Sequence, residues 1–217
     1  MTTQANYMTL MGIRLGERFD ALWKELYNVN EKWAEYVTLY STKPERIALL
    51  NSAAPVFFGI AQEAILHDIV LSITRLTEER RDTMTVYTLP HAVKDAFKKE
   101  VRSLVAEAQR RSEICKEWRD KHIAHRNADI ALKKAAVLPP LTKVYIQKAL
   151  DSIGAVLSTV HDRYTGSGML FERPSHPGGA SELLHVLDDG VKVAEGREKR
   201  LHSGKDIRPE DWTRRDF

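Results

Sequence analysis

The chain has 217 residues, of which 43% are hydrophobic and 29% charged, with a net charge of +3 and a pI near 8.9. These values suit one globular domain of about 150 residues with an appendage, and they permit a nucleic-acid partner without requiring one. The single cysteine, Cys115, excludes an internal disulfide and a thiol-rich zinc site, which favours the cytoplasm. Because the sequence shows no basic leader and no apolar run of about 20 residues, neither secretion nor membrane insertion is expected.

Two long amphipathic helices are predicted in the first half of the chain. Apolar residues recur at spacings of three, four and seven between residues 15 and 40, which predicts one helix there. The stretch 41–45 then offers hydroxyl caps, a proline and an acidic residue, which are helix-start signals. We therefore expect a second helix from Pro44 to about Glu79, with a kink at Pro55.

The second half predicts two further helical stretches and a tail. Helical periodicity extends from about residue 91 to residue 126, and again from the Pro139-Pro140 pair to about residue 164. Residues 165–217 are rich in glycine, proline and charge, which predicts a linker and a loosely ordered C-terminal tail with a short helix at 181–194. The expected fold is all-α: a bundle of four to five helices over residues 1–164, followed by the flexible tail.

Polar residues continue the apolar stripe of two predicted helices. They are Asp68, Ser72 and Arg75 on one helix, and Arg119, His122 and Arg126, with His125 at the edge, on the other. At about 100° of rotation per residue, these polar side chains lie on the face that points toward the core. Burying a charge there costs several kcal/mol unless the charge is paired. Three explanations remain open: an ion pair of Asp68 with Arg75 or Arg119, a wet interface between subunits, or a polar cleft that binds an anion or performs chemistry.

The second of these stripes carries a recognisable motif. The segment Arg119-Asp120-Lys121-His122-Ile123-Ala124-His125-Arg126-Asn127 places a polar residue directly after an arginine and a histidine after five intervening positions. This arrangement resembles the motif of the HEPN superfamily. The same segment, together with Ser72-Ile73-Thr74-Arg75-Leu76, resembles the abortive-infection (AbiU-type) branch of that superfamily, and the resemblance covers about residues 15 to 164.

The resemblance implies a metal-independent endoribonuclease of an abortive-infection or toxin-like defence system. Arg119 and His125 would be the catalytic pair, and the supporting residues would be Asp120, His122, Arg126, Asp68 and Arg75. The site would form where two protomers meet, so a homodimer and RNA are the expected partners. An antitoxin protein is a further possible partner, and no cofactor, metal or membrane is expected.

These residue types suit RNA cleavage. A guanidinium can hold the scissile phosphate through two hydrogen bonds and stabilise the charge that develops on its oxygens. Histidine, whose ordinary pKa lies near neutrality, can accept the 2′-hydroxyl proton or protonate the leaving 5′-oxygen, which leaves a 2′,3′-cyclic phosphate. On a straight helix, however, Arg119 and His125 lie about 120° apart and about 9 Å apart along the axis. The helix must therefore end or bend near Ile123, or a second subunit must complete the site.

Other interpretations of the same residues remain open. His122 and His125 alone would leave most of a zinc shell unfilled, and Cys115 on the apolar stripe is more typical of a core side chain than of a nucleophile. Asp68 could orient Arg119 or His125, or it could form a purely structural salt bridge. The alternative function is a non-catalytic HEPN-type module that binds RNA, nucleotide or a protein partner. A purely structural dimerisation bundle is a third hypothesis.

Overall fold

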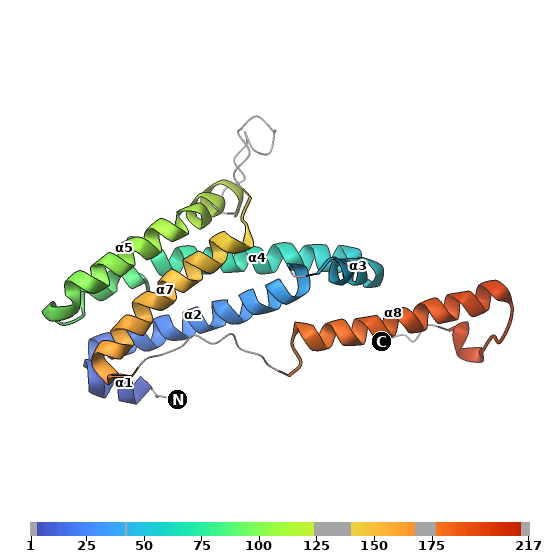
Figure 1. Cartoon of the computed structure of the whole chain (residues 1–217), viewed down its shortest axis with the longest axis horizontal. Helices are drawn as coiled ribbons and strands as arrows, with labels where there is room; N and C mark the ends of the chain where they lie inside the picture. The colour runs from blue at the N-terminus through green and yellow to red at the C-terminus, as the bar shows by residue number, and fades with distance from the viewer. Residues whose placement is uncertain (1–3, 42, 124–139, 168–176, 214–217) are drawn as a thin grey trace. The chain divides into compact units, whose positions relative to one another are not determined.

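The computed structural model describes residues 4–41, 43–123, 140–167 and 177–213, which are helical and contain no β-strand (Figure 1). The all-α prediction is therefore confirmed for this part of the chain. The α-helices are α1 (Gln4–Met11), α2 (Ile13–Tyr40), α3 (Pro44–Ala53), α4 (Pro55–Thr77), α5 (Asp95–Trp118), α7 (Lys143–Thr165) and α8 (Ala180–Ser203). Two 3-10 helices, η1 (Val86–His91) and η3 (Pro209–Asp211), and a π-helical turn, η2 (Arg119–Ile123), complete the described elements.

The short helix α1 was not predicted from the sequence. It reverses into α2 at Gly12, whose φ of +84° is a conformation that glycine adopts without steric cost. One turn later, a Cβ at Gly16 would lie 2.6 Å from the backbone of Met8. The absence of a side chain at Gly16 therefore lets α1 pack directly on α2.

The predicted helix 44–79 is two helices rather than one kinked helix. The first begins at Pro44, as expected, but Ala54 has φ −161° and ψ 74° and ends it before Pro55. Proline disfavours the α conformation in the residue that precedes it, and its ring is well suited to a first helical position. The helix therefore starts again at Pro55, so faces extrapolated from α3 do not continue into α4.

The chain divides into two compact units. The first contains Met1–Ala34 and Ala64–Pro174, and the second contains Glu35–Glu63 and Ser175–Phe217. Helices α2 and α4 each contribute residues to both units. This grouping differs from the expected division between residues 1–164 and a tail, because part of the tail packs with α3. Composition alone predicts the division at residue 164, and it carries no information about these contacts.

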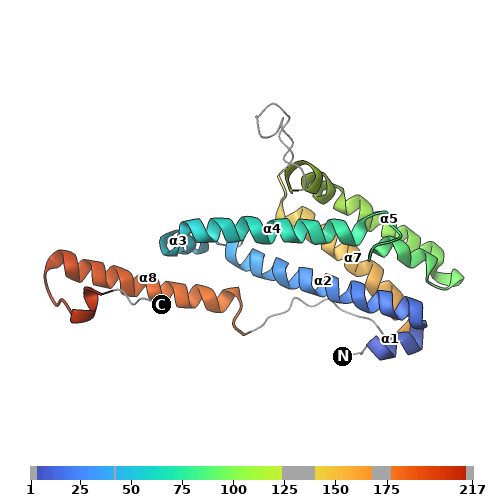
Figure 2. The ribbon, with the colours of Figure 1, turned by 180° about the vertical axis from the view of Figure 1, so that it is seen from behind.

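The core of the first unit is formed by long helices that pack lengthwise. Helices α5 and α7 lie side by side in both views, and η1 packs against α5 (Figures 1 and 2). The Trp33 indole of α2 donates a 2.9 Å hydrogen bond to the Gln147 side chain of α7. The fully buried side chains include Phe19, Leu22, Leu26, Ile69, Ile73, Leu76, Leu89, Ile146, Leu150, Ile153 and Leu157. This core holds the segments that carry the predicted site.

The predicted inward stripe of α4 is correct at one position and wrong at two. Ser72 is buried, but Asp68 and Arg75 lie near the surface with side chains 49% and 55% exposed. Asp68 forms a 2.5 Å ion pair with Lys32, and Arg75 pairs with Glu25, both on α2. The expected pairing of Asp68 with Arg75 or Arg119 is not what the structure contains. Helix α4 buries the face that carries Ile69, Ile73 and Leu76, which leaves Asp68 and Arg75 outside the core.

The second unit contains a helix that is longer than the predicted 181–194 segment. Helix α8 runs from Ala180 to Ser203 and packs against α3, with Leu184 in a core that includes Leu39, Leu50 and Phe58. The carboxylate of Glu35 accepts a hydrogen bond from the backbone N–H of Ala180, so an acidic group occupies the positive end of the helix dipole. The predicted loosely ordered tail thus contains a packed, capped helix.

The C-terminal end of α8 is also held. The Arg200 guanidinium makes two hydrogen bonds, of 2.8 and 2.6 Å, with the carboxylate of Asp211 in η3. Asp211 also accepts a 3.0 Å hydrogen bond from the backbone N–H of Arg208. These bonds lower the pKa of the buried Asp211 carboxyl, with the Arg200 hydrogen bond as the largest cause. The segment after α8 is therefore anchored by charge as well as by packing.

Helix α4 is unusually apolar for its degree of burial. By length and composition it could cross a membrane, with a mean hydropathy of 1.6 over its most apolar window and 28% of that window buried. The core helix of a soluble protein meets the same two criteria. Near its N-terminal end Val56, Phe57 and Ile60 are 76%, 63% and 65% exposed. An exposed apolar cluster of this kind commonly marks an interaction surface.

Candidate functional site

The predicted motif lies where the winding of its helix changes. Helix α5 ends at Trp118, and Arg119 begins the π-helical turn η2, in which backbone hydrogen bonds join residues five apart. Regular α-helical winding therefore ends at Trp118, a few residues before the position near Ile123 where an end or a bend was one of the expectations. Such turns interrupt regular helices frequently at functional sites. Arg119 itself still continues the face of α5, because its backbone N–H bonds to the carbonyls of Cys115 and Lys116.

Arg119 is held by two carboxylates. Its guanidinium forms an ion pair with Glu78, which follows α4, and its Nε donates a 2.7 Å hydrogen bond to Asp120. The hydrogen bond with Asp120, and to a lesser degree the Glu78 pair, raise the pKa of Arg119 above its ordinary value. Because the side chain is 22% exposed, the guanidinium is fixed in place yet remains accessible to solvent. It is charged at every physiological pH.

Arg119 lines a polar cleft of about 310 Å³ in the first unit, together with residues from α4, the segment after it and α5. The other lining residues are Thr74, Thr77, Glu78, Glu79, Arg80, Gln109, Ser112, Glu113 and Lys116. The Gln109 side chain donates a 3.3 Å hydrogen bond to the Thr77 carbonyl, which ties α5 to the end of α4. The cleft therefore has walls fixed by both helices.

Ser112 adds an unsatisfied polar group to this cleft. Its side chain is 2% exposed, and its hydroxyl has no hydrogen-bond partner within the described residues. A buried hydroxyl without a partner costs about 1–3 kcal/mol, so its presence needs an explanation. A ligand atom that enters the cleft could supply the missing hydrogen bond. Ser112 and Arg119 thus give the cleft one neutral and one cationic group that could contact an anion.

The remaining predicted residues are only partly brought together. Asp120 contacts Arg119 directly, as above, and the His122 ring packs on Trp118 with centroids 4.6 Å apart. Asp68 and Arg75 pair with α2 and do not line the cleft. His125 and Arg126 lie outside the described residues. The assignment of Arg119 and His125 as a catalytic pair therefore stays a prediction.

Two residues of the cleft were missed by the sequence analysis. Glu78 gave no local signal of a site, because its partner Arg119 lies 41 residues away in the chain. Ser112 offered a usable signal, since it falls between Ala108 and Cys115 on the same stripe of α5 as Arg119. A serine on an apolar stripe that continues into a charged residue is a signal by which Ser112 could have been named as a candidate site residue.

Cys115, one turn before Arg119, behaves as a core residue. Its side chain is fully buried, and burial raises the pKa of the thiol to about 12. The reactive thiolate is therefore scarce at neutral pH, and a nucleophilic role is not supported. Within the described residues, no group of three or more histidine, cysteine, aspartate or glutamate side chains is placed to hold a metal ion.

The arrangement around Arg119 suits the binding of a phosphate diester. A guanidinium presents a planar fork of donors that matches two phosphate oxygens. Carboxylates pair with that fork in the structure, so an entering phosphate would exchange with Glu78 or Asp120. The carboxylates keep the guanidinium in position until the exchange occurs. This geometry supports the binding of an anion at Arg119.

Comparison with known proteins gives one match. The family model of AbiU2, a HEPN family, matches residues 13–184, which extends past the expected limit at 164 and into α8. No curated protein and no solved structure matches the chain. The matched segment includes the whole Arg119–Asn127 motif and the helices that form the cleft. The chain therefore belongs to the AbiU2 family of HEPN proteins.

Proposed function

We propose that this protein is a metal-independent endoribonuclease of an abortive-infection or toxin-like defence system. The observation that carries the proposal is the position of Arg119, accessible in a polar cleft and held by Glu78 and Asp120 at the start of a π-helical turn. Membership of the AbiU2 family supports an abortive-infection HEPN domain, and HEPN domains are often ribonucleases. We place the activity in the cytoplasm.

The proposed reaction is a transfer within the RNA strand. The ribose 2′-oxygen attacks the adjacent phosphorus, the bond from phosphorus to the 5′-oxygen breaks, and a 2′,3′-cyclic phosphate and a 5′-hydroxyl are formed. His125 accepts the proton of the 2′-hydroxyl or delivers one to the leaving 5′-oxygen. Arg119 binds the non-bridging oxygens and stabilises their developing charge. The proton released by the 2′-hydroxyl balances the proton taken up by the 5′-oxygen, and the step needs no metal ion.

The proposal includes a homodimer, which would supply two histidines to one cleavage event. The exposed apolar residues Val56, Phe57 and Ile60 on α4 support a further burial surface for a second copy of the chain. Sedimentation analysis at micromolar concentration is the direct measurement. A species of twice the chain mass supports this part of the proposal, and a monomer at high concentration contradicts it.

The decisive experiment is incubation of the purified protein with total cellular RNA in the presence of EDTA. Wild type is expected to cleave and to leave cyclic phosphate ends, whereas His125→Ala is expected to lose at least about 100-fold in rate. Lys121→Ala is the matched control, because Lys121 lies within the motif but is assigned no role there and pairs with Glu117 on the preceding helical turn. Equal cleavage by wild type and His125→Ala would contradict the proposed mechanism.

A second function, a non-catalytic RNA-binding module, is favoured by one specific observation. Glu78 and Asp120 already pair with Arg119, and the exchange of one of them for a phosphate is enough to bind RNA without any chemical step. This alternative predicts that wild type binds RNA in EDTA but produces no new ends. Loss of binding in Arg119→Ala without any cleavage by wild type would establish it.

A further inference from the structure

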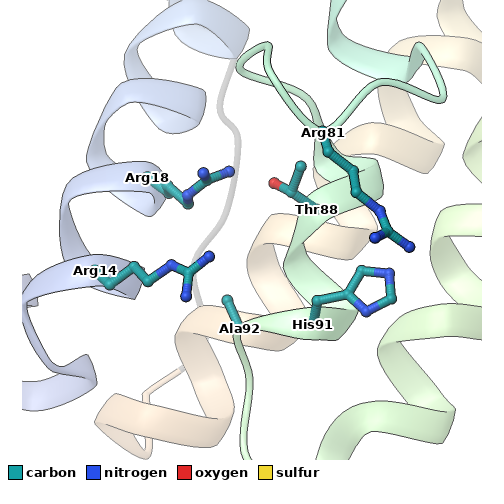
Figure 3. A pocket seen from close by; sticks show the side chains of 6 residues that line it. All are labelled: Arg14, Arg18, Arg81, Thr88, His91 and Ala92. Carbon is teal, nitrogen blue, oxygen red and sulfur yellow. The ribbon is translucent and has the colours of Figure 1, made fainter.

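A second cavity, which is lined by cations, lies in the first unit. It has a volume of about 210 Å³ and is lined by Arg14, Arg18, Arg81, Thr88, His91 and Ala92, which we call the arginine pocket. Arg14 and Arg18 extend from α2 on one side, and Arg81 and His91 come from the segment between α4 and α5 on the other (Figure 3). None of these residues belongs to the predicted HEPN motif.

Arg75, Arg119 and Arg200 each pair with a carboxylate, but the arginines of this pocket have no such partner among the described residues. Within the described residues, no carboxylate forms an ion pair with Arg14, Arg18 or Arg81. Arg14 and Arg18 are one helical turn apart, so their side chains project from the same face of α2. Three guanidinium groups around one cavity repel one another unless an anion lies among them. The pocket is therefore built to be occupied by a negatively charged group.

The positive charge of Arg81 is available because its two neighbours in the chain pair with each other. The guanidinium of Arg80 makes two hydrogen bonds, of 3.1 and 2.7 Å, with the carboxylate of Asp82, which neutralises both of these neighbours. Arg81 is left as the cation that this short segment presents to the pocket (Figure 3). The local acidic residue thus pairs with Arg80 and leaves the charge of Arg81 available.

The lining chemistry points to a phosphate rather than to a base. Guanidinium groups match phosphate oxygens through paired hydrogen bonds, and the Thr88 hydroxyl and the His91 ring add further polar atoms. Nucleotide pockets are usually lined mainly by apolar and aromatic side chains, whereas three of the six residues that line this pocket are arginines and its one aromatic ring is the His91 imidazole. Arg14 and Arg81 are solvent-exposed, so a passing strand could reach them. A backbone phosphate, contacted without regard to sequence, fits these features.

The arginine pocket is also a neighbour of the Arg119 cleft. Arg80 lines the cleft and Arg81 lines the pocket, and their Cα atoms are about 3.8 Å apart as consecutive residues. We propose that the arginine pocket holds a backbone phosphate of the same RNA strand whose scissile phosphate binds at Arg119. This inference rests on the proposed function, since it assigns a second contact to that substrate.

The test is RNA binding by the full chain carrying His125→Ala, so that cleavage cannot affect the measurement. Fluorescence anisotropy with a labelled RNA of about 20 nucleotides compares this protein with one that also carries Arg14→Ala and Arg18→Ala. We expect roughly tenfold weaker binding and a salt dependence shallower by about 0.7 for each phosphate that is no longer neutralised. The matched control is Lys99→Ala with Arg102→Ala, which removes the same charge from exposed α5 positions that line neither cavity.

Each outcome decides the inference. Selective weakening in the Arg14 and Arg18 variant supports it, provided that circular dichroism shows the same fold. An equal loss of RNA affinity in the control variant would mean that only net charge matters, and it would overturn the inference. The absence of RNA binding by the His125→Ala protein would overturn it as well. Competition by 5′-AMP at concentrations close to those of the RNA would assign the pocket to a small nucleotide instead. Failure of wild type to cleave RNA would contradict the proposed function, but the binding measurement would still test the arginine pocket.

Discussion

The Arg119 cleft and the arginine pocket both present guanidinium groups near the protein surface, but they differ in whether carboxylates pair with those groups. Arg119 is paired with Glu78 and Asp120 and has little freedom, whereas Arg14, Arg18 and Arg81 have no carboxylate partner among the described residues. A paired guanidinium is positioned in advance but must exchange partners to bind an anion. An unpaired one is free to bind, but it repels its neighbours until it does. The first arrangement suits a transition state, and the second suits a substrate contact.

The largest effect is expected from Arg119→Lys. Lysine keeps the positive charge and can still pair with Glu78, but it loses the planar fork that contacts two phosphate oxygens. We expect the cleavage rate at saturating RNA to fall about 100-fold, as for the loss of one donor to a developing oxyanion. Single-turnover cleavage of a labelled RNA measures this change. A rate near that of wild type would show that Arg119 supplies charge alone.

The double variant Arg14→Ala with Arg18→Ala is expected to act on substrate binding and not on the chemical step. Its KM for RNA should rise about tenfold while kcat stays near the wild-type value, because the contact is the same in the ground and transition states. Initial rates over a range of RNA concentrations separate the two constants. A fall in kcat would mean that the arginine pocket does more than hold the strand.

A smaller effect is expected when Arg119 loses its partner after α4. Glu78→Gln should raise RNA affinity a few fold, because the phosphate no longer competes with that carboxylate, and should lower the free energy of unfolding by about 1 kcal/mol. Glu79→Gln is the control, since it removes the same charge from the same cleft but breaks no ion pair that holds Arg119. RNA titration and urea denaturation measure the two effects. Identical behaviour of both variants would indicate that only the overall charge of the cleft matters.

Arg200 provides a third case, in which pairing has a structural role. Because Arg200 and the Arg208 backbone lower the pKa of Asp211 in the folded state, the pair stabilises the fold above the ordinary aspartate pKa of about 3.9. This contribution is lost as the pH falls through the lower, folded pKa. Thermal unfolding should therefore separate wild type from Asp211→Asn at pH 7, and the difference should shrink below about pH 4. A difference that is independent of pH would contradict this role.

Several elements of the fold could be predicted because their signals are local. Pro44 marks the beginning of α3, and Gly166 has the left-handed conformation that ends α7 next to the predicted limit at residue 164. Pro55 was expected to kink one long helix, but it separates two helices. Asp68 and Arg75 were expected in the core, but α4 buries the face of Ile69, Ile73 and Leu76 instead. Local signals thus predicted where helices occur better than which face they bury.

The sequence by itself determined the all-α class, the family resemblance and the presence of Arg119 beside Asp120, because propensities, helix signals and short motifs act over a few residues. The tertiary structure decided that Glu78 pairs with Arg119 across 41 residues and that Ser112 faces the same cleft. It also brought Arg14 and Arg18 of α2 to Arg81. These contacts depend on how helices pack, and periodicity along one helix does not specify its neighbours.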